Sequence, residues 1–270
     1  MTFAPGWSAL AVAGAMVLLL LLERRFPLRP RTEPQPPRLA RNLALGGFSA
    51  ALVTLLQPVA LGPVARLVDA HRLGLLSLLP LPRWASVAAA VILLDYTLWH
   101  WHRWTHRVPW LWRFHLVHHA DRDLDVSTAL RFHFGEMALS VPYRAAQMAL
   151  IGAGSEALAL WTGVLLVSIA FHHSNLRLPA ALDVRLARVL VTPRMHGIHH
   201  SERREEMDSN FSSLLSVWDA LHRTLRLDVP QERVSIGVPG YRDRRELGLR
   251  AQLTLPFRQH HPYWPPGAGS

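Results

Sequence analysis

Histidines at regular spacings are the residues of this chain whose type and spacing could do chemistry. Twelve of the 16 histidines lie between positions 100 and 200. The segments 115–119 and 196–200 share the pattern H-x-x-H-H, and His102 and His106 are four residues apart. Residues three and four apart share one face of a helix, so each group presents several imidazole rings on one side. Neutral imidazole is the commonest protein ligand for metals, and this many rings suffice for two ions.

The composition narrows the kind of metal site. The 270-residue chain has no Cys, which excludes thiolate zinc sites, iron–sulfur clusters and disulfide scaffolds. An all-imidazole site suits iron or zinc, whereas magnesium and calcium prefer oxygen ligands. Of these two metals only iron has redox chemistry. Surface histidines without a metal are the alternative, but imidazolium groups at this density would repel one another, and a shared metal removes that repulsion.

Apolar segments supply the elements that would position these histidines. An apolar run at 7–22 precedes an Arg-rich and Pro-rich segment, which reverses the charge order of a cleaved signal peptide, so we expect an uncleaved anchor. Further membrane spans are predicted at 43–64 and 84–101. Two shorter runs, 137–151 and 157–171, predict a helical hairpin that either spans or re-enters the membrane. A buried hairpin of a soluble core is the alternative.

The distribution of charge orients these elements. All 29 basic residues other than histidine are Arg, against 19 acidic residues, and the formal net charge is +10. By the positive-inside rule the Arg-rich segment 24–41 is cytoplasmic, so residues 100–136 and 172–270 share the cytoplasmic face. We therefore predict an all-α integral membrane bundle of about three spans plus a hairpin, capped by a cytosolic histidine-rich metal-binding region.

Further motifs surround the histidine boxes between residues 90 and 225. They are Leu111-Trp112-Arg113-Phe114 before the first box, Thr128-Ala129-Leu130-Arg131-Phe132-His133-x-x-Glu136, Phe171-x-His173-x-Asn175, Thr192-Pro193-x-Met195 before the second box, Asp208-x-Asn210-Phe211 and Trp218-Asp219. In this order they resemble the fatty acid hydroxylase/sterol desaturase superfamily of integral membrane enzymes. The resemblance implies a histidine-bound dimetal centre, normally di-iron, that activates O2 to hydroxylate or desaturate lipid C–H bonds.

The resemblance also implies roles for individual residues. The implied metal ligands are His102, His106, His115, His118, His119, His173, His196, His199 and His200. His133 stands at a further family histidine, as a ligand or a neighbour of the ligands, but Phe134 follows it where the family often has Pro. Residues expected to hydrogen-bond the ligand rings and fix their tautomers are Asp95, Glu136, Asn175, Asn210 and Asp219. For Asp219 a helix cap or an Arg partner is the alternative role.

The remaining histidines divide into two sets. His71, His260 and His261 lie outside the boxes and are expected at the protein surface. His100, His172 and His222 are left without an assigned role.

The family also implies a domain organisation and partners. Residues 1–90 are expected to form membrane anchor helices and an Arg/Pro-rich loop, 91–225 the catalytic domain, and 226–270 a C-terminal cytosolic tail. The expected cofactors are two iron ions, with O2 as co-substrate and a fatty acyl, sterol-like or ether lipid as substrate. No flavin site or cytochrome b5-like segment is visible in the sequence. A separate reductase or electron-transfer protein is therefore an expected partner, and the oligomeric state is left open.

The expected location is a bacterial inner membrane, which the chain would cross several times, with the active site facing the cytoplasm. A membrane metal transporter, or a metal-binding protein without oxygenase activity, is the alternative function. Transport pathways usually scatter histidines along the spans and mix them with Asp and Glu, whereas here they gather at the predicted cytoplasmic ends. The basic charge alone suggests nucleic acid, but no reading motif accompanies it, and contact with anionic lipid explains it more simply. We therefore predict no nucleic-acid partner.

Overall fold

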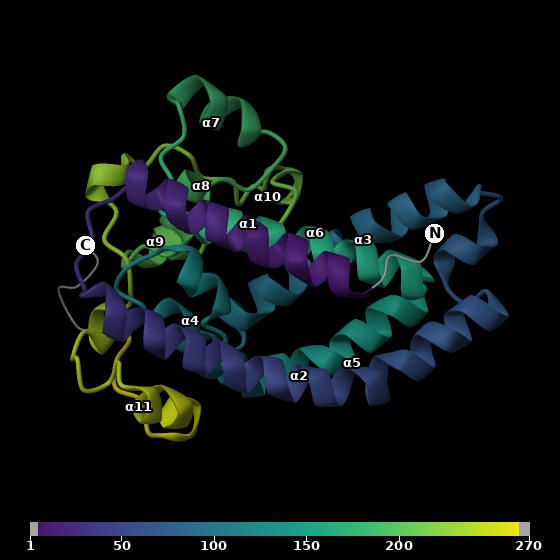
Figure 1. Cartoon of the computed structure of the whole chain (residues 1–270), viewed down its shortest axis with the longest axis horizontal. Coiled ribbons are helices and arrows are strands. Elements are labelled where there is room, and N and C mark those ends of the chain that lie inside the picture. Colours follow the sequence, from purple (N-terminus) through teal and green to yellow (C-terminus); the bar gives the residue numbers. More distant parts are fainter. Residues whose placement is uncertain (1–4, 265–270) are drawn as a thin grey trace.

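The apolar runs of the sequence form five long helices in the computed structural model, which describes residues 5–264. They are α1 (Pro5–Arg25), α2 (Gln35–His71), α3 (Arg83–Arg107), α5 (Phe134–Ile151) and α6 (Ser155–His173). In Figure 1 the long helices extend to the right, away from the short elements at the left end of the molecule. The described chain has no strand beyond three isolated bridges, which confirms the prediction of an all-α fold.

Short helices and 3₁₀ turns lie between and after the long helices, and two of them, α4 and α8, carry most of the two H-x-x-H-H boxes. The helices are α4 (Pro109–His119), α7 (Ala180–Leu186), α8 (Pro193–His199), α9 (Arg204–Met207), α10 (Val217–Leu221) and α11 (Leu249–Thr254). The 3₁₀ turns are η1 (Leu75–Leu78), η2 (Val126–Leu130), η3 (Gln231–Arg233), η4 (Pro239–Tyr241) and η5 (Leu255–Phe257). Both α4 and α8 begin with proline, whose fixed φ suits the first helical turn. At α8 the Thr192 hydroxyl also accepts a hydrogen bond from the Met195 amide, which caps the helix.

The two helices predicted as a hairpin, α5 and α6, pack mainly against other long helices and not against each other. α5 and α6 follow one another through a turn at 152–154, but α5 lies along α2, whereas α6 lies along α1 and α3. Gly152, at a φ of +85°, makes this turn possible. A Cβ on Gly152 would lie 2.6 Å from the Leu73 carbonyl oxygen, so only glycine permits the close approach of the turn to the end of α2.

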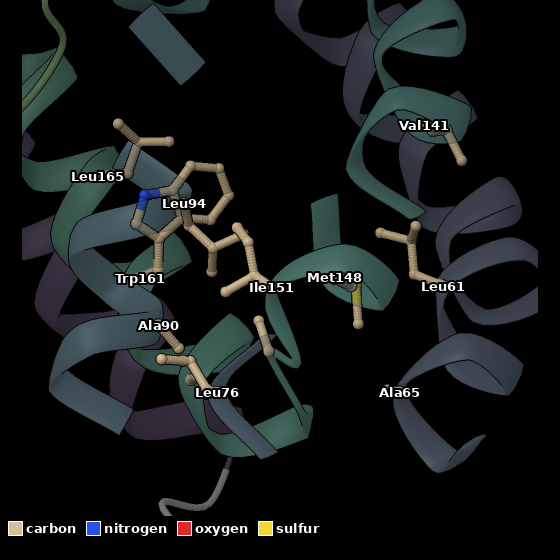
Figure 2. Close-up of a cluster of buried hydrophobic side chains, with 12 residues drawn as sticks. Leu61, Ala65, Leu76, Ala90, Leu94, Val141, Met148, Ile151, Trp161 and Leu165 are labelled. Atoms are coloured by element: carbon tan, nitrogen blue, oxygen red, sulfur yellow. The ribbon is translucent and has the colours of Figure 1, made fainter. Parts of the chain in front are cut away.

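Buried apolar side chains fill the space between the long helices. Figure 2 shows Trp161 and Leu165 of α6 beside Leu94 of α3, while Met148 of α5 faces Leu61 of α2. Other large apolar side chains lie on the outside of the same helices, among them Leu10, Val17, Leu18, Leu43, Phe48, Leu55, Val59, Leu150, Leu160 and Val164. In the described chain two segments, Gln35–Leu78 and Ser155–His173, are long and apolar enough to cross a membrane.

Polar contacts tie together those ends of the long helices that lie nearest the short elements. The Leu28 amide donates to the Asn175 carbonyl oxygen (2.8 Å), which joins the chain after α1 to the chain after α6. Arg38, near the start of α2, pairs with Asp121 after α4 (2.7 Å). The Arg-rich segment 24–41 and the histidine boxes therefore lie at one end of the bundle. That this end faces the cytoplasm stays a prediction.

The segment 226–264, predicted as part of a C-terminal tail, packs against the histidine-bearing elements. Trp264 stacks on Trp112 of α4, with ring centroids 6.3 Å apart. Gln252 of α11 accepts a hydrogen bond from the Arg131 guanidinium (2.7 Å). These contacts make the segment part of the core around α4. The last residues of the predicted tail, 265–270, lie outside the described part of the chain.

Candidate metal centre

Nine of the ten histidines predicted as ligands form two groups at the ends of α3, α4, α6 and α8. The five-member group is His102, His106, His115, His119 and His199, and the four-member group is His118, His173, His196 and His200. In each group, one ring nitrogen from every member lies within 4.8 Å of the others. All members are buried except His106, which is partly exposed. Each group could hold a metal ion.

The two H-x-x-H-H boxes contribute to both groups. In the α4 box the first and last histidines join the five-member group, and the middle one joins the four-member group. In the α8 box the first and last histidines join the four-member group, and the middle one joins the five-member group. Successive residues point about 100° apart around a helix, so the last two histidines of each box reach neighbouring sites. The groups are consequently adjacent, and the rings of His119 and His200 stack between them with centroids 4.3 Å apart.

Hydrogen bonds on the outer side of the rings fix their tautomers. Nδ1 contacts a backbone carbonyl oxygen in His102 (Phe211, 2.7 Å), His118 (Arg131, 3.3 Å), His173 (Ile169, 2.8 Å) and His199 (Ser209, 2.7 Å). A carbonyl oxygen can only accept, so each of these rings donates from Nδ1. The opposite nitrogen, Nε2, therefore keeps its lone pair in the neutral ring.

The inner nitrogens of the four-member group fit a bound cation. Nε2 of His118 lies 3.0 Å from Nε2 of His173, although neither of these nitrogens carries a proton that could bridge them. Nε2 of His196 lies 3.1 Å from the same atom of His173 and of His200. The lone pairs of His118 and His173, held this close in a buried site, repel one another, and a metal ion shared by the four rings would remove the repulsion.

The five-member group fits a cation for a different reason. It contains buried ring nitrogens without a hydrogen-bonding partner: Nε2 of His106, His115 and His199, and both nitrogens of His119. Buried polar atoms without partners are rare in folded proteins and call for a ligand. A metal ion between these rings would satisfy their lone pairs.

Burial keeps these imidazoles neutral. It lowers the pKa of His119 and of His200 well below the ordinary value, and the neighbouring histidines lower both further. Burial likewise lowers the pKa of His199 to about 3. Neutral imidazole is the form that binds metals, so the surroundings already favour the ligating state.

Of the five polar residues predicted to hydrogen-bond the ligand rings, Glu136 does so. Its Oε1 accepts a bond from Nδ1 of His115 (3.0 Å), and both side chains are buried. Asp95 contacts no ligand ring and instead accepts bonds from the Trp218 indole (2.7 Å) and the Leu215 amide (3.1 Å). It precedes His102 by seven residues, about 10 Å along the helix axis, and this separation is too long for contact.

Asp219 and Asn210 hold backbone segments instead of rings. Asp219 accepts a bond from the Phe211 amide (2.9 Å) and thereby positions the residue whose carbonyl oxygen contacts His102. Asn210, at a φ of +54°, donates to the Met195 carbonyl oxygen in α8 (2.9 Å). Both residues therefore act on the histidines through one intervening residue.

Arg29 is a residue of this site that no sequence motif indicated. Its amide donates to Asn175 Oδ1, and Asn175 Nδ2 donates to the Arg29 carbonyl oxygen (2.9 Å each), so Asn175 also contacts no ligand ring. The Arg29 guanidinium lies against Gly197 of α8, where a Cβ would come within 2.1 Å of Nη1. Arg29 and Asn175 thus tie the chain after His173 to α8. The glycine inside the histidine box is the signal that could have indicated such a contact.

Two other histidines belong to neither group. His133 belongs to neither group, because Nδ1 accepts a bond from the Gly135 amide (2.9 Å) and Nε2 donates to the Leu253 carbonyl oxygen (3.1 Å). Neither of its nitrogens has a free lone pair for a metal. His172, which had no assigned role, is buried with its ring centroid 4.1 Å from that of His196.

The chain is similar in sequence to a known protein family. A family model described as fatty acid hydroxylase matches residues 87–224. The ornithine lipid hydroxylase OlsE of Rhizobium tropici is 30% identical over 176 residues, which cover 64% of this chain and 50% of that protein. The alkylglycerol monooxygenase of Homo sapiens is 27% identical over 150 residues, 56% of this chain and 32% of that protein. A cholesterol 25-hydroxylase-like protein of Danio rerio is 28% identical over 153 residues, 53% of this chain and 56% of that protein.

The alignments therefore span only about a third to somewhat over a half of the relatives' own lengths. No solved structure matches the chain.

Proposed function

The chain belongs to the fatty acid hydroxylase family, and from this premise we propose that it is an O2-dependent di-iron lipid oxidoreductase. The proposed reaction is hydroxylation or desaturation of a C–H bond in a fatty acyl, sterol-like or ether lipid. The observation that carries the proposal is the pair of adjacent histidine groups, which contain buried ring nitrogens without a hydrogen-bonding partner. The names of two relatives, an ornithine lipid hydroxylase and an alkylglycerol monooxygenase, agree with a lipid substrate.

Iron ions bound in the two groups would supply the activation of O2. The chain's own residues prepare the ligands for this role. Glu136 keeps the proton of His115 at Nδ1, and the Phe211 carbonyl oxygen does the same for His102. The rings therefore present lone pairs without a change of tautomer. Because all members but one are buried, the two groups also exclude bulk water.

The proposed reaction takes electrons from outside the substrate. Hydroxylation consumes the C–H bond, O2, two electrons and two protons, and it yields an alcohol and one water. Desaturation consumes the same electrons and protons and yields an alkene and two waters. The chain has no Cys with which to hold an iron–sulfur relay, so we propose a separate electron-transfer protein as partner.

We further propose that the long helices cross a membrane several times and hold the histidine groups at its cytoplasmic side. Large apolar side chains on the outer faces support this, for example Leu55, Val59 and Leu150, each more than two-thirds exposed. The Arg-rich segment 24–41 at the same end as the histidines supports the orientation. A lipid would then reach the histidine groups from within the bilayer, along the long helices. The bacterial inner membrane is the location we propose.

The test is to load the purified protein with ferrous iron without O2, then add O2, a chemical reductant and a lipid mixture. We expect two iron ions per chain and an oxidised lipid that has gained one oxygen or lost two hydrogens. Replacement of His71, an exposed residue far from both groups in sequence, by Ala is the matched control and should change neither result. Metal transport into liposomes without O2 consumption would overturn the proposal and favour a transporter.

A further inference from the structure

Arg144 places a cation on the buried side of α5. The exposed stripe of this helix consists of Pro142, Ala146 and Leu150. Arg144 lies on the opposite side, three residues after Val141 and four before Met148, which are both buried in the apolar cluster. Figure 2 shows these two apolar residues on α5, in the same cluster as Trp161 of α6.

In the described part of the chain no oxygen accepts a hydrogen bond from Arg144, and no carboxylate pairs with it. Its guanidinium carbon lies 5.3 Å from the centroid of the Trp161 ring, a cation–π contact. Trp161 is fully buried, and its own indole N–H has no acceptor. Arg38, in contrast, is buried at the histidine end of the bundle and pairs with both Asp121 and Asp125.

The lack of an acidic partner matters because of where Arg144 lies. A cation–π contact offsets only part of the free energy that is lost when a guanidinium leaves water. Charged side chains inside membrane segments are rare, and those that face the protein interior mark paths or sites for ligands and ions. Arg144 is only partly buried, and none of its nitrogens is among the fully buried polar atoms without a partner, so its guanidinium is accessible to a ligand.

We propose that Arg144 binds the anionic head group of an amphiphile, a carboxylate or a phosphate, whose apolar chain lies along the long helices. A planar guanidinium can donate two parallel hydrogen bonds to either group. The bound anion supplies the charge that no residue of the chain supplies. Identification of this amphiphile as the substrate rests on the proposed function.

The position of Arg144 also limits which carbon can react. Glu136, which contacts His115, lies eight residues earlier on α5, about 12 Å along the helix axis. A substrate whose charged group binds Arg144 would bring to the histidine groups a carbon far from that group. Oxidation next to the head group is therefore not expected.

The experiment measures equilibrium binding of four probes to the iron-loaded protein in a neutral detergent. Palmitate and hexadecyl phosphate carry the anion on an apolar chain, hexadecanol carries the chain alone, and inorganic phosphate is the anion alone. We expect both anionic amphiphiles to bind at least tenfold more tightly than hexadecanol. In Arg144→Gln this preference should fall to near onefold with hexadecanol binding unchanged, while Arg144→Lys should keep part of it. An undiminished preference for the anionic amphiphiles in Arg144→Gln would overturn the proposal. Binding of inorganic phosphate as tight as that of the anionic amphiphiles would overturn it too, because the apolar chain would then contribute nothing.

A second variant separates ligand binding from a purely structural role. Arg144→Met keeps the length of the side chain and removes the unpaired charge, so the ligand-free protein should melt at the same or a higher temperature. A clear drop in melting temperature would instead assign Arg144 to the fold through Trp161 and would contradict the proposal. Charge-selective binding without any oxidised lipid would support this inference and contradict the proposed function. Lipid oxidation without charge-selective binding would support the proposed function and contradict this inference.

Discussion

The two histidine groups differ in the number of their members and in what holds their rings. In the four-member group, backbone carbonyl oxygens of Arg131 and Ile169 hold His118 and His173. The five-member group has two such carbonyl contacts and, in addition, the Glu136 carboxylate on His115. A carboxylate that accepts from one nitrogen of an imidazole makes the other nitrogen a stronger ligand. We therefore expect the five-member group to bind its metal more tightly and to tolerate the loss of one ligand.

Each group also has one helix that contributes histidines to it and not to the other group. α4 and α8 contribute histidines to both groups, so a substitution there disturbs both. α3 supplies His102 and His106 to the five-member group only, and α6 supplies His173 to the four-member group only. Substitutions on α3 and α6 can therefore test one group at a time.

The largest effect is expected from His173→Ala. It leaves three nitrogens in the four-member group, so the iron content should fall from two ions per chain to one. Lipid oxidation should fall by more than about 100-fold, because even residues behind metal ligands typically contribute 10–100-fold. Iron analysis of the purified variant and product detection by mass spectrometry measure the two effects.

His106→Ala is the counterpart in the five-member group. Four nitrogens remain, so we expect two iron ions to be retained, with one of them lost faster to a chelator. Equal iron loss in His106→Ala and His173→Ala would contradict the proposed difference between the groups.

Glu136→Gln tests the carboxylate that distinguishes the groups. The amide keeps the shape of the side chain, but it removes the negative charge beside His115 Nδ1. Metal affinity of the five-member group should fall by about 10–100-fold while the four-member group is unchanged. Asp95→Asn is the matched control, since Asp95 is equally buried and contacts no ligand ring. Competition with a chelator, followed for each ion, gives the affinities, and equal weakening by both variants would assign the effect to the fold.

The full set of nine ligands, His173 included, followed from the family resemblance, and the tertiary structure brings them together at the ends of α3, α4, α6 and α8. The spacing of the histidines predicted only which members of one box share a helix face. The apolar runs likewise predicted the five long helices, since length and hydropathy are local properties. The predictions from spacing and from the apolar runs depend on residues close together in the sequence.

The contacts of the rings could not be predicted in the same way. The carbonyl oxygens of Phe211, Ser209, Arg131 and Ile169 carry no mark in the sequence, because every residue has one. Their role depends on how distant segments approach, as does that of Arg29 at Gly197. The family resemblance implied both Glu136 and Asp95 beside a ring, but two helical turns separate Asp95 from His102.

Asp219→Asn is expected to have a smaller effect on metal binding, and it tests whether the backbone contact of His102 matters to the five-member group. Asp219 Oδ1 accepts the Phe211 amide and Oδ2 accepts the Ser212 amide (2.9 Å each). An Asn side chain would place an N–H against one of these amides, at a cost of about 1–3 kcal/mol in the free energy of unfolding. The displaced Phe211 carbonyl oxygen should weaken the five-member group through His102. Denaturant titration and chelator competition measure the two effects, and weakening of the four-member group instead would contradict this route.

The smallest effect is expected from His133→Ala, which marks the outer limit of both groups. Its ring nitrogens bind the Gly135 amide and the Leu253 carbonyl oxygen, so its removal takes no lone pair from either group. The loss of the cap on α5 should cost about 1 kcal/mol in the free energy of unfolding, with iron content and oxidation unchanged. Thermal melting and iron analysis of the purified variant test this. If an iron ion were lost, His133 would have to turn toward the groups when metal binds, and the boundary between the five-member group and its surroundings would need to be redrawn.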